Sequence, residues 1–140
     1  MPVKSIARGV EQLVTAGPET TVRDLAQLMQ EGAVGSVVIV ENDEPVGIVT
    51  DRDLALEVIN RDLEFDALAK DVMTRDPVTV DAETGVFEMC ETMKHNKVRR
   101  MPVVEDGELV GIVTLDDLVV LLQDEMEDIA DVIRSEAPPY

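Results

Sequence analysis

The feature that most constrains this fold is an internal repeat with a fixed offset of 64 residues. Residues 47–54 read Gly-Ile-Val-Thr-Asp-Arg-Asp-Leu, and residues 111–118 repeat the Gly, Ile, Val, Thr, Asp and Leu at the same places. A gap-free comparison of residues 14–54 with residues 78–118 gives 17 identical pairs. This regularity indicates two copies of one supersecondary unit, each too small to bury its own sheet.

Each copy is predicted to contain a strand, a helix, two further strands and a second helix. In the first copy a helix begins near Val22, where apolar residues recur at helical spacing, and an apolar run over residues 36–41 predicts a buried strand. A tight turn at residues 42–45 leads to a returning strand. That strand ends at Thr50, which starts a second helix through about Asn60.

The second copy repeats this order. Its hairpin carries Asp106 and Gly107, a pair typical of type I′ turns. Its last helix is expected to start at Thr114 and to run as far as Ile133. The apolar register breaks near Gln123, so both one helix and two helices remain open at this stage.

The two units are expected to pack against each other about a pseudo-two-fold axis. The predicted fold is therefore α/β (α+β), with two strand-helix-strand-strand-helix repeats. Residues 1–65 form the first repeat and residues 66–140 the second, together one globular module. Such an axis places the two strand-to-helix junctions at corresponding edges of a shared interface, and clefts between paired units are common ligand sites.

The charge of the chain limits its partners. Its 30 acidic and 12 basic residues give a formal net charge of −18 at pH 7. Nucleic acid is not expected as a partner, because phosphate contacts need a basic face. No run approaches the roughly 18 apolar residues of a membrane span, and the first residues do not resemble a signal peptide. We therefore expect a cytoplasmic protein that does not bind membranes.

An acidic surface with few lysines resembles that of cytosolic proteins from microbes that live in high salt. Dissolved ions screen the repulsion between surface carboxylates, so salt should stabilise this chain. We expect its melting temperature to rise between low and molar NaCl. A melting temperature that falls over this range would contradict the assignment of a high-salt host.

The repeated Thr-x-x-Asp at the start of each second helix has two interpretations. Thr50 and Thr114 can cap the helices, with Asp53 and Asp117 favoured in the first turn by the helix dipole. A helix N-terminus can also hold a phosphate, and a carboxylate one turn further can accept the hydroxyls of a ribose. The pattern alone does not choose between a structural cap and a ligand site.

Several segments together resemble the cystathionine-β-synthase (CBS) domain. They are the repeated Gly-Ile-Val-Thr-x-x-Asp-Leu, the Arg-Met-Pro-Val-Val of residues 100–104, the Asp-Val-Met-Thr of residues 71–74 and the Pro-Val-Thr-Val of residues 77–80. The resemblance covers essentially the whole chain as two tandem copies. It implies a disc-like module that commonly binds adenosine nucleotides such as AMP or ATP in two clefts and often dimerises. Such modules act as energy or ligand sensors rather than as enzymes.

Carried over residue by residue, the resemblance assigns the ribose to Asp53 and Asp117. Thr50 and Thr114 would contact ribose or phosphate. Arg52 lies beside Thr50 in the same turn, and Asp116 lies beside Thr114. The base would pack against a preceding strand and its flank, formed by Ile6, Val34 and Gly35 in one cleft and by Val72, Met73 and Val98 in the other.

The two clefts are expected to differ in charge. In this family, basic residues often precede the second strand of a unit and meet phosphates. Arg99 and Arg100 occupy that place in the second copy, whereas Gly35 and Ser36 carry no charge in the first. We expect Arg99 and Arg100 to hold phosphates in the cleft of Thr114 and Asp117. Asp116 counts against that cleft and Arg52 favours the cleft of Thr50, so their ranking stays open.

The resulting hypothesis is a regulatory module that binds an adenosine nucleotide and forms a homodimer through its helices. The alternative is a ligand-independent module for protein interaction or dimerisation. No nucleophile with a neighbouring base and no metal-ligand cluster stands out, so we expect no enzymatic activity, no metal and no catalytic cofactor. A regulated protein partner would be a further component, of unknown identity.

Overall fold

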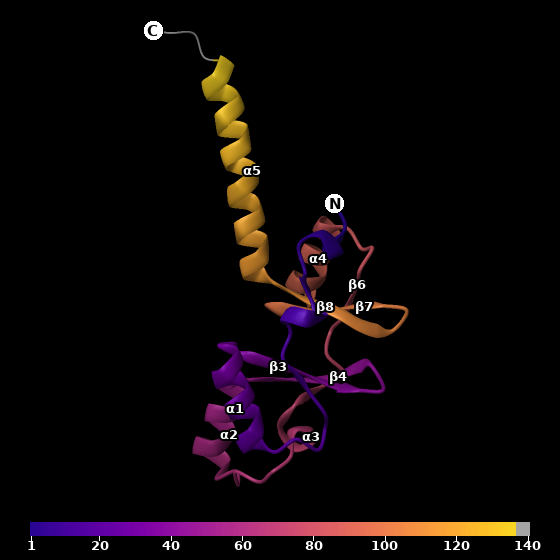
Figure 1. Cartoon of the computed structure of the whole chain (residues 1–140), viewed down its shortest axis with the longest axis vertical. Coiled ribbons are helices and arrows are strands. Elements are labelled where there is room, and N and C mark those ends of the chain that lie inside the picture. Colours follow the sequence, from indigo (N-terminus) through magenta and orange to yellow (C-terminus); the bar gives the residue numbers. More distant parts are fainter. Residues whose placement is uncertain (137–140) are drawn as a thin grey trace.

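The computed structural model describes residues 1–136. Figure 1 shows two halves, one with α1, α2 and α3 beside β3 and β4, the other with α4 beside β7 and β8. A long helix, α5, projects away from the second half. The helices are α1 (Val22–Gly32), α2 (Asp51–Arg61), α3 (Ala69–Val72), α4 (Val86–Asn96) and α5 (Leu115–Glu136), with the 3₁₀ helices η1 (Val3–Ser5) and η2 (Val10–Gln12).

Each half contains one four-stranded sheet, with the order β2-β3-β4-β5 in the first half and β1-β8-β7-β6 in the second. The two central strands of each sheet form an antiparallel hairpin, and a parallel strand flanks it. The predicted strand-helix-strand-strand-helix order is confirmed in both copies. The strands are β1 (Arg8–Gly9), β2 (Thr15–Ala16), β3 (Ser36–Glu41), β4 (Glu44–Thr50), β5 (Thr74–Arg75), β6 (Val80–Asp81), β7 (Arg100–Glu105) and β8 (Glu108–Thr114).

The two hairpin turns have the same backbone conformation. Asp106 and Gly107 have φ values of 52° and 82°, and Asn42 and Asp43 have φ values of 54° and 64°. Positive φ at both central residues is the mark of a type I′ turn, whose twist matches that of the flanking strands. The type I′ turn predicted at Asp106 and Gly107 is therefore confirmed, and the first copy builds the same turn from Asn and Asp.

Each sheet takes one edge strand from the segment that precedes the other copy. Strand β1, near the N-terminus, pairs antiparallel with β8, so that Gly9 lies opposite Gly111. Strand β5, between the copies, pairs antiparallel with β4, so that Arg75 lies opposite Gly47. The predicted division after residue 65 stays a prediction; in the folded chain the two halves share their edge strands.

Ion pairs accompany this exchange at corresponding places. Lys70 Nζ lies 3.0 Å from Glu19 Oε1 in the first half, and Lys4 pairs with Glu83 in the second. The hydrogen bond and charge of Glu83 raise the pKa of Lys4 above its ordinary value. All four side chains are largely exposed, so these pairs contribute little to stability and chiefly show that the two attachments are equivalent.

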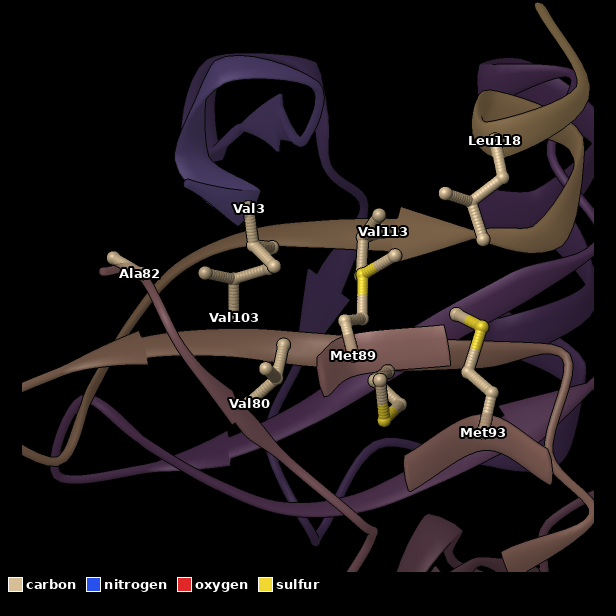
Figure 2. Close-up of a cluster of buried hydrophobic side chains, with 9 residues drawn as sticks. Val3, Val80, Ala82, Met89, Met93, Val103, Val113 and Leu118 are labelled. Atoms are coloured by element: carbon tan, nitrogen blue, oxygen red, sulfur yellow. The ribbon is translucent and has the colours of Figure 1, made fainter. Parts of the chain in front are cut away.

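Two aliphatic cores fill the halves, and each includes a residue from an exchanged segment. Figure 2 shows Val3 of η1 beside Val103 in the second core, and Ala69 of α3 is fully buried in the first. The first core consists of Val22, Leu25, Met29, Val37, Ile39, Val49, Leu54 and Ala69. The second consists of Val3, Val80, Ala82, Met89, Met93, Met101, Val103, Val113 and Leu118.

The C-terminal segment differs from one of the two predictions. Residues Leu115–Glu136 form one continuous helix, so the two-helix alternative is wrong. Only Leu118 of this helix is buried. Because the other side chains do not pack into a core, the apolar residues of α5 need not follow the 3.6-residue spacing of a helix face that packs against one. No helix described within residues 1–136 is both long enough and apolar enough to cross a membrane.

Candidate nucleotide-binding clefts

The junctions at which β4 enters α2 and β8 enters α5 have the same local structure. Thr50 Oγ1 accepts a hydrogen bond from Asp53 N at 3.0 Å, and Asp53 Oδ2 accepts one from Thr50 N at 2.9 Å. Thr114 Oγ1 accepts from Asp117 N at 3.3 Å, and Asp117 Oδ2 accepts from Thr114 N at 2.8 Å. These reciprocal bonds are capping boxes, so the structural interpretation of Thr-x-x-Asp is confirmed at both junctions.

Capping leaves the second carboxylate oxygen of each aspartate in a different position. Within residues 1–136, Asp53 Oδ1 takes part in no hydrogen bond or ion pair, and the side chain is half-buried. Asp117 Oδ1, in contrast, lies 3.6 Å from Nε of Arg8, which comes from the exchanged strand β1. The cap and a ligand contact can therefore coexist at Asp53, whereas Arg8 already faces the spare oxygen of Asp117.

A cavity of about 400 Å³ lies next to the first junction and is called the Thr50 cleft here. Its volume falls within the 300–1,000 Å³ typical of small-molecule sites. Residues of the second half face the junction of the first half across it. Its lining is Ile48, Thr50, Arg52, Asp53, Thr74, Asp76, Pro77, Val78, Val98, Arg99 and Arg100.

A smaller cavity of about 200 Å³ lies next to the second junction and is called the Thr114 cleft. Its volume is below the usual range for a small-molecule site. Residues of the first half and of the N-terminal segment face the second junction across it. Its lining is Arg8, Gln12, Leu13, Val14, Ala33, Val34, Gly35, Ser36, Val38, Arg100, Ile112, Thr114 and Asp116.

The two clefts are related by the sequence repeat. Adding 64 to residues 12–14 and 34–36 of the Thr114 cleft gives residues 76–78 and 98–100 of the Thr50 cleft. Subtracting 64 from Ile112, Thr114 and Asp116 likewise gives Ile48, Thr50 and Arg52. Strands β4 and β8 contact each other where the halves meet (Figure 1). Each cleft therefore joins the junction of one copy to the strand entrance of the other, as expected for a pseudo-two-fold axis.

The structure corrects the expected grouping of the arginines. Arg99 lines the Thr50 cleft and is absent from the Thr114 cleft, whereas Arg100 lines both. The Arg99 side chain therefore borders the other cleft than the one expected, although the Arg99 carbonyl accepts a hydrogen bond from Leu115 N, beside Thr114. The cause of this difference is the crossing of the halves, because the entrance of β7 faces the junction of the other copy.

The residues expected around the base are only partly brought together. Val98 lines the Thr50 cleft, and Val34 and Gly35 line the Thr114 cleft. Ile6 packs against the second core and lines neither cleft. Val72 and Met73 likewise pack against the first core outside both clefts. The exchanged segments direct these side chains into the cores, and residues a few positions further along the chain reach the clefts instead.

The clefts carry basic side chains in a strongly acidic protein. Three arginines line the Thr50 cleft together with Asp53 and Asp76. The Thr114 cleft has two arginines, Arg8 and Arg100, and one acidic residue, Asp116. Since most of this surface repels anions, positively charged clefts are the places where a phosphate would be attracted.

Some cleft residues were not predicted from the sequence. Pro77 and Val78 add apolar surface to the Thr50 cleft, and Leu13 and Val14 hold the equivalent places in the Thr114 cleft. The repeat offset could have found them, because they directly precede or begin the aligned region. Within residues 1–136, no three His, Cys, Asp or Glu side chains are arranged to hold a metal ion.

Comparison with known proteins identifies the repeat. The model of the CBS domain matches residues 3–60 and 69–124. An uncharacterized protein of Methanopyrus kandleri is 38% identical over 135 residues, which cover 89% of this chain and 68% of the relative.

Two solved structures have the same fold. CBSX2 in complex with AMP is 30% identical with a TM-score of 0.76, over 89% of this chain and 98% of that one. A CBS domain protein from Pyrobaculum aerophilum, complexed with AMP, is 26% identical with a TM-score of 0.75, over 88% and 97% of the two chains. The chain therefore belongs to the CBS domain family and contains two tandem copies of that domain.

Proposed function

We propose that this protein is a regulatory module that binds an adenosine nucleotide in the Thr50 cleft. The observation that carries the proposal is the combination, in one cavity of about 400 Å³, of the Thr50–Asp53 junction with three arginines. Similar proteins support the ligand class, since CBSX2 and the Pyrobaculum aerophilum protein were both solved with AMP.

Each part of the cleft matches one part of a nucleotide. The spare Oδ1 of Asp53 would accept hydrogen bonds from ribose hydroxyls, as acidic residues do in other nucleotide sites. The guanidinium groups that line the cleft would hold the phosphates through charge-assisted hydrogen bonds. These groups belong to Arg52, Arg99 and Arg100. The base would lie on apolar surface contributed by Ile48, Pro77, Val78 and Val98.

The Thr114 cleft is proposed as a weaker second site. Its volume is half that of the Thr50 cleft, and Arg8 lies against the aspartate that would otherwise accept the ribose. A ligand there would have to displace Arg8 from Asp117 or bind without that contact. Occupancy of this cleft should therefore require a higher nucleotide concentration.

The proposal is tested by thermal unfolding in the presence of AMP, ADP and ATP. A ligand that binds only the folded state stabilises it by RT ln(1 + [L]/Kd), so the melting temperature should rise with the logarithm of nucleotide concentration. Asp53→Asn keeps an oxygen for the cap and replaces the second acceptor with an NH₂ group. We expect this variant to lose most of the shift.

Asp117→Asn is the matched control, because it makes the same change at the equivalent position of the other junction. We expect it to retain most of the nucleotide-dependent shift. Equal loss in both variants would show that capping, not the Thr50 cleft, controls the effect. No shift with any of the three nucleotides would reject the proposal.

Together with the regulatory role, we propose that the protein is cytoplasmic and associates with a second copy. We also propose that it has no enzymatic activity and no catalytic cofactor. The main alternative is ligand-independent protein interaction. A surface that could support it is a groove of about 530 Å³ between α1 and α2, lined by apolar side chains that include Leu54, Ile59 and Phe65. A module of that kind would melt at the same temperature with and without nucleotide.

A further inference from the structure

Helix α5 carries an apolar stripe that nothing within residues 1–136 covers. The members of this stripe are Leu115, Val119, Leu122, Met126, Ile129 and Ile133. All six are exposed in the structure. Figure 1 shows the distal part of α5 well away from every other labelled element. This helix therefore presents a continuous apolar surface to whatever lies outside the chain.

The spacing within the stripe is that of a coiled coil. Leu115, Leu122 and Ile129 recur every seven residues, and so do Val119, Met126 and Ile133, which gives two stripe members in every seven residues, a period of 3.5. A helix packed against a globular core follows a period of 3.6, whereas a period of 3.5 keeps one narrow stripe facing a partner helix. The stripe extends over the whole length from Leu115 to Ile133, so it specifies a helical partner of similar length.

The side chains in the stripe favour a parallel pair of identical helices. In heptad notation, Val119, Met126 and Ile133 occupy position a, and Leu115, Leu122 and Ile129 occupy position d. β-Branched residues at a combined with Leu at d are typical of parallel two-stranded coiled coils. Two of the three a positions are β-branched here, and two of the three d positions are Leu.

The charges of α5 allow a second acidic copy to approach. Beyond the first turn, the positions that flank the stripe hold Gln123, Glu125, Ala130 and Val132, of which only Glu125 is charged. Four further acidic residues lie on the outward side, at Asp124, Glu127, Asp128 and Asp131, and Glu136 follows the last apolar member at the end of the helix. Between Val119 and Ile133, only Glu125 thus brings a like charge beside the interface, although the chain as a whole carries −18.

We propose that α5 pairs with α5 of a second copy of this chain, through the apolar stripe, as a parallel coiled coil. The contact involves neither cleft. It therefore stands independently of nucleotide binding and would join two modules at the bases of their C-terminal helices.

Two neighbouring valines provide a matched test. Val119 lies in the stripe and Val120 lies beside it, and both are 58% exposed. Sedimentation equilibrium at physiological and molar salt should give twice the chain mass of 15.4 kDa for the unmodified protein. Val119→Glu should be monomeric and Val120→Glu dimeric, and circular dichroism should show both folded. A monomeric unmodified protein, or a dimer that Val119→Glu leaves intact, would overturn the proposal.

The parallel register has its own test by disulfide cross-linking. In a parallel pair, position 126 lies opposite itself, so Met126→Cys in a Cys90→Ser background should form a covalent dimer when diamide oxidises the two thiols. Glu127→Cys, one residue away on the outward side, should form far less. Equal cross-linking by both variants, or none by Met126→Cys, would contradict a parallel arrangement.

Discussion

Replacing Arg99 with alanine is expected to weaken AMP binding about tenfold. A hydrogen bond to a charged group contributes about 1.5–3 kcal/mol, and the exposure of Arg99 places its contribution at the lower end. About 1.4 kcal/mol corresponds to one factor of ten in Kd. Because Arg99 lines only the Thr50 cleft, its loss should act on that cleft alone. The difference from the unmodified protein should shrink at high salt, since ions screen the attraction.

Arg61→Ala provides the control for net charge. Arg61 lies at the exposed end of α2, pairs with Glu57 at 3.4 Å and lines neither cleft. Both variants remove one positive charge from the chain, so a long-range effect of charge would appear equally in both. Titration calorimetry should give an unchanged Kd for Arg61→Ala. Equal weakening by the two variants would contradict a direct contact between Arg99 and the phosphates.

Replacing Gly111 with alanine is expected to lower the free energy of unfolding by about 1–3 kcal/mol, the usual range for overpacking. A methyl group at this position would overlap the backbone carbonyl oxygen of Arg8. That oxygen belongs to β1, which pairs with β8 in the exchanged sheet edge. Backbone cannot move aside without breaking this pairing, so the strain should loosen the N-terminal segment.

Gly47→Ala is the matched control, because Gly47 holds the equivalent position in the first copy. A methyl group there would meet the side chain of Met73 instead of backbone. Methionine has three rotatable bonds and can adopt another rotamer, so the cost should be smaller. Urea unfolding of the two variants measures both costs. A Gly47→Ala cost equal to or above that of Gly111→Ala would contradict the difference between the two sheet edges.

Much of the fold could be predicted from the repeat and from local patterns. The offset of 64 correctly predicted two equivalent units, and the apolar run before residue 42 predicted the buried strand β3. Hydroxyl residues at helix starts predicted the caps, which Thr50 and Thr114 form through their side chains. These features depend on neighbouring residues, so the local sequence carries enough information to place them.

The exchange of edge strands could not be predicted in the same way. Strands β1 and β5 contain two residues each, too few to show an alternating pattern. Their positions depend on which sheet edge is available after the halves pack together. The sequence also left open whether residues 115–136 form one helix or two. The 3.6-residue spacing of a core-facing helix breaks near Gln123, whereas the heptad spacing of the apolar stripe continues through it.

The candidate site was predicted in its chemistry more than in its arrangement. Thr50, Arg52 and Asp53 were selected from the motif and do line one cleft together. Their partners across the cleft depend on how the second half lies against the first. For that reason the Arg99 side chain was expected in the Thr114 cleft, and only the structure shows that it lines the Thr50 cleft.

Titration calorimetry of AMP into the purified protein tests the central claim most directly. We expect a saturable heat that corresponds to one stronger site per chain, the Thr50 cleft, with any second site weaker. Asp53→Asn should remove the stronger site and Asp117→Asn should leave it in place. The absence of binding heat with AMP, ADP and ATP at several temperatures would contradict nucleotide binding by this protein.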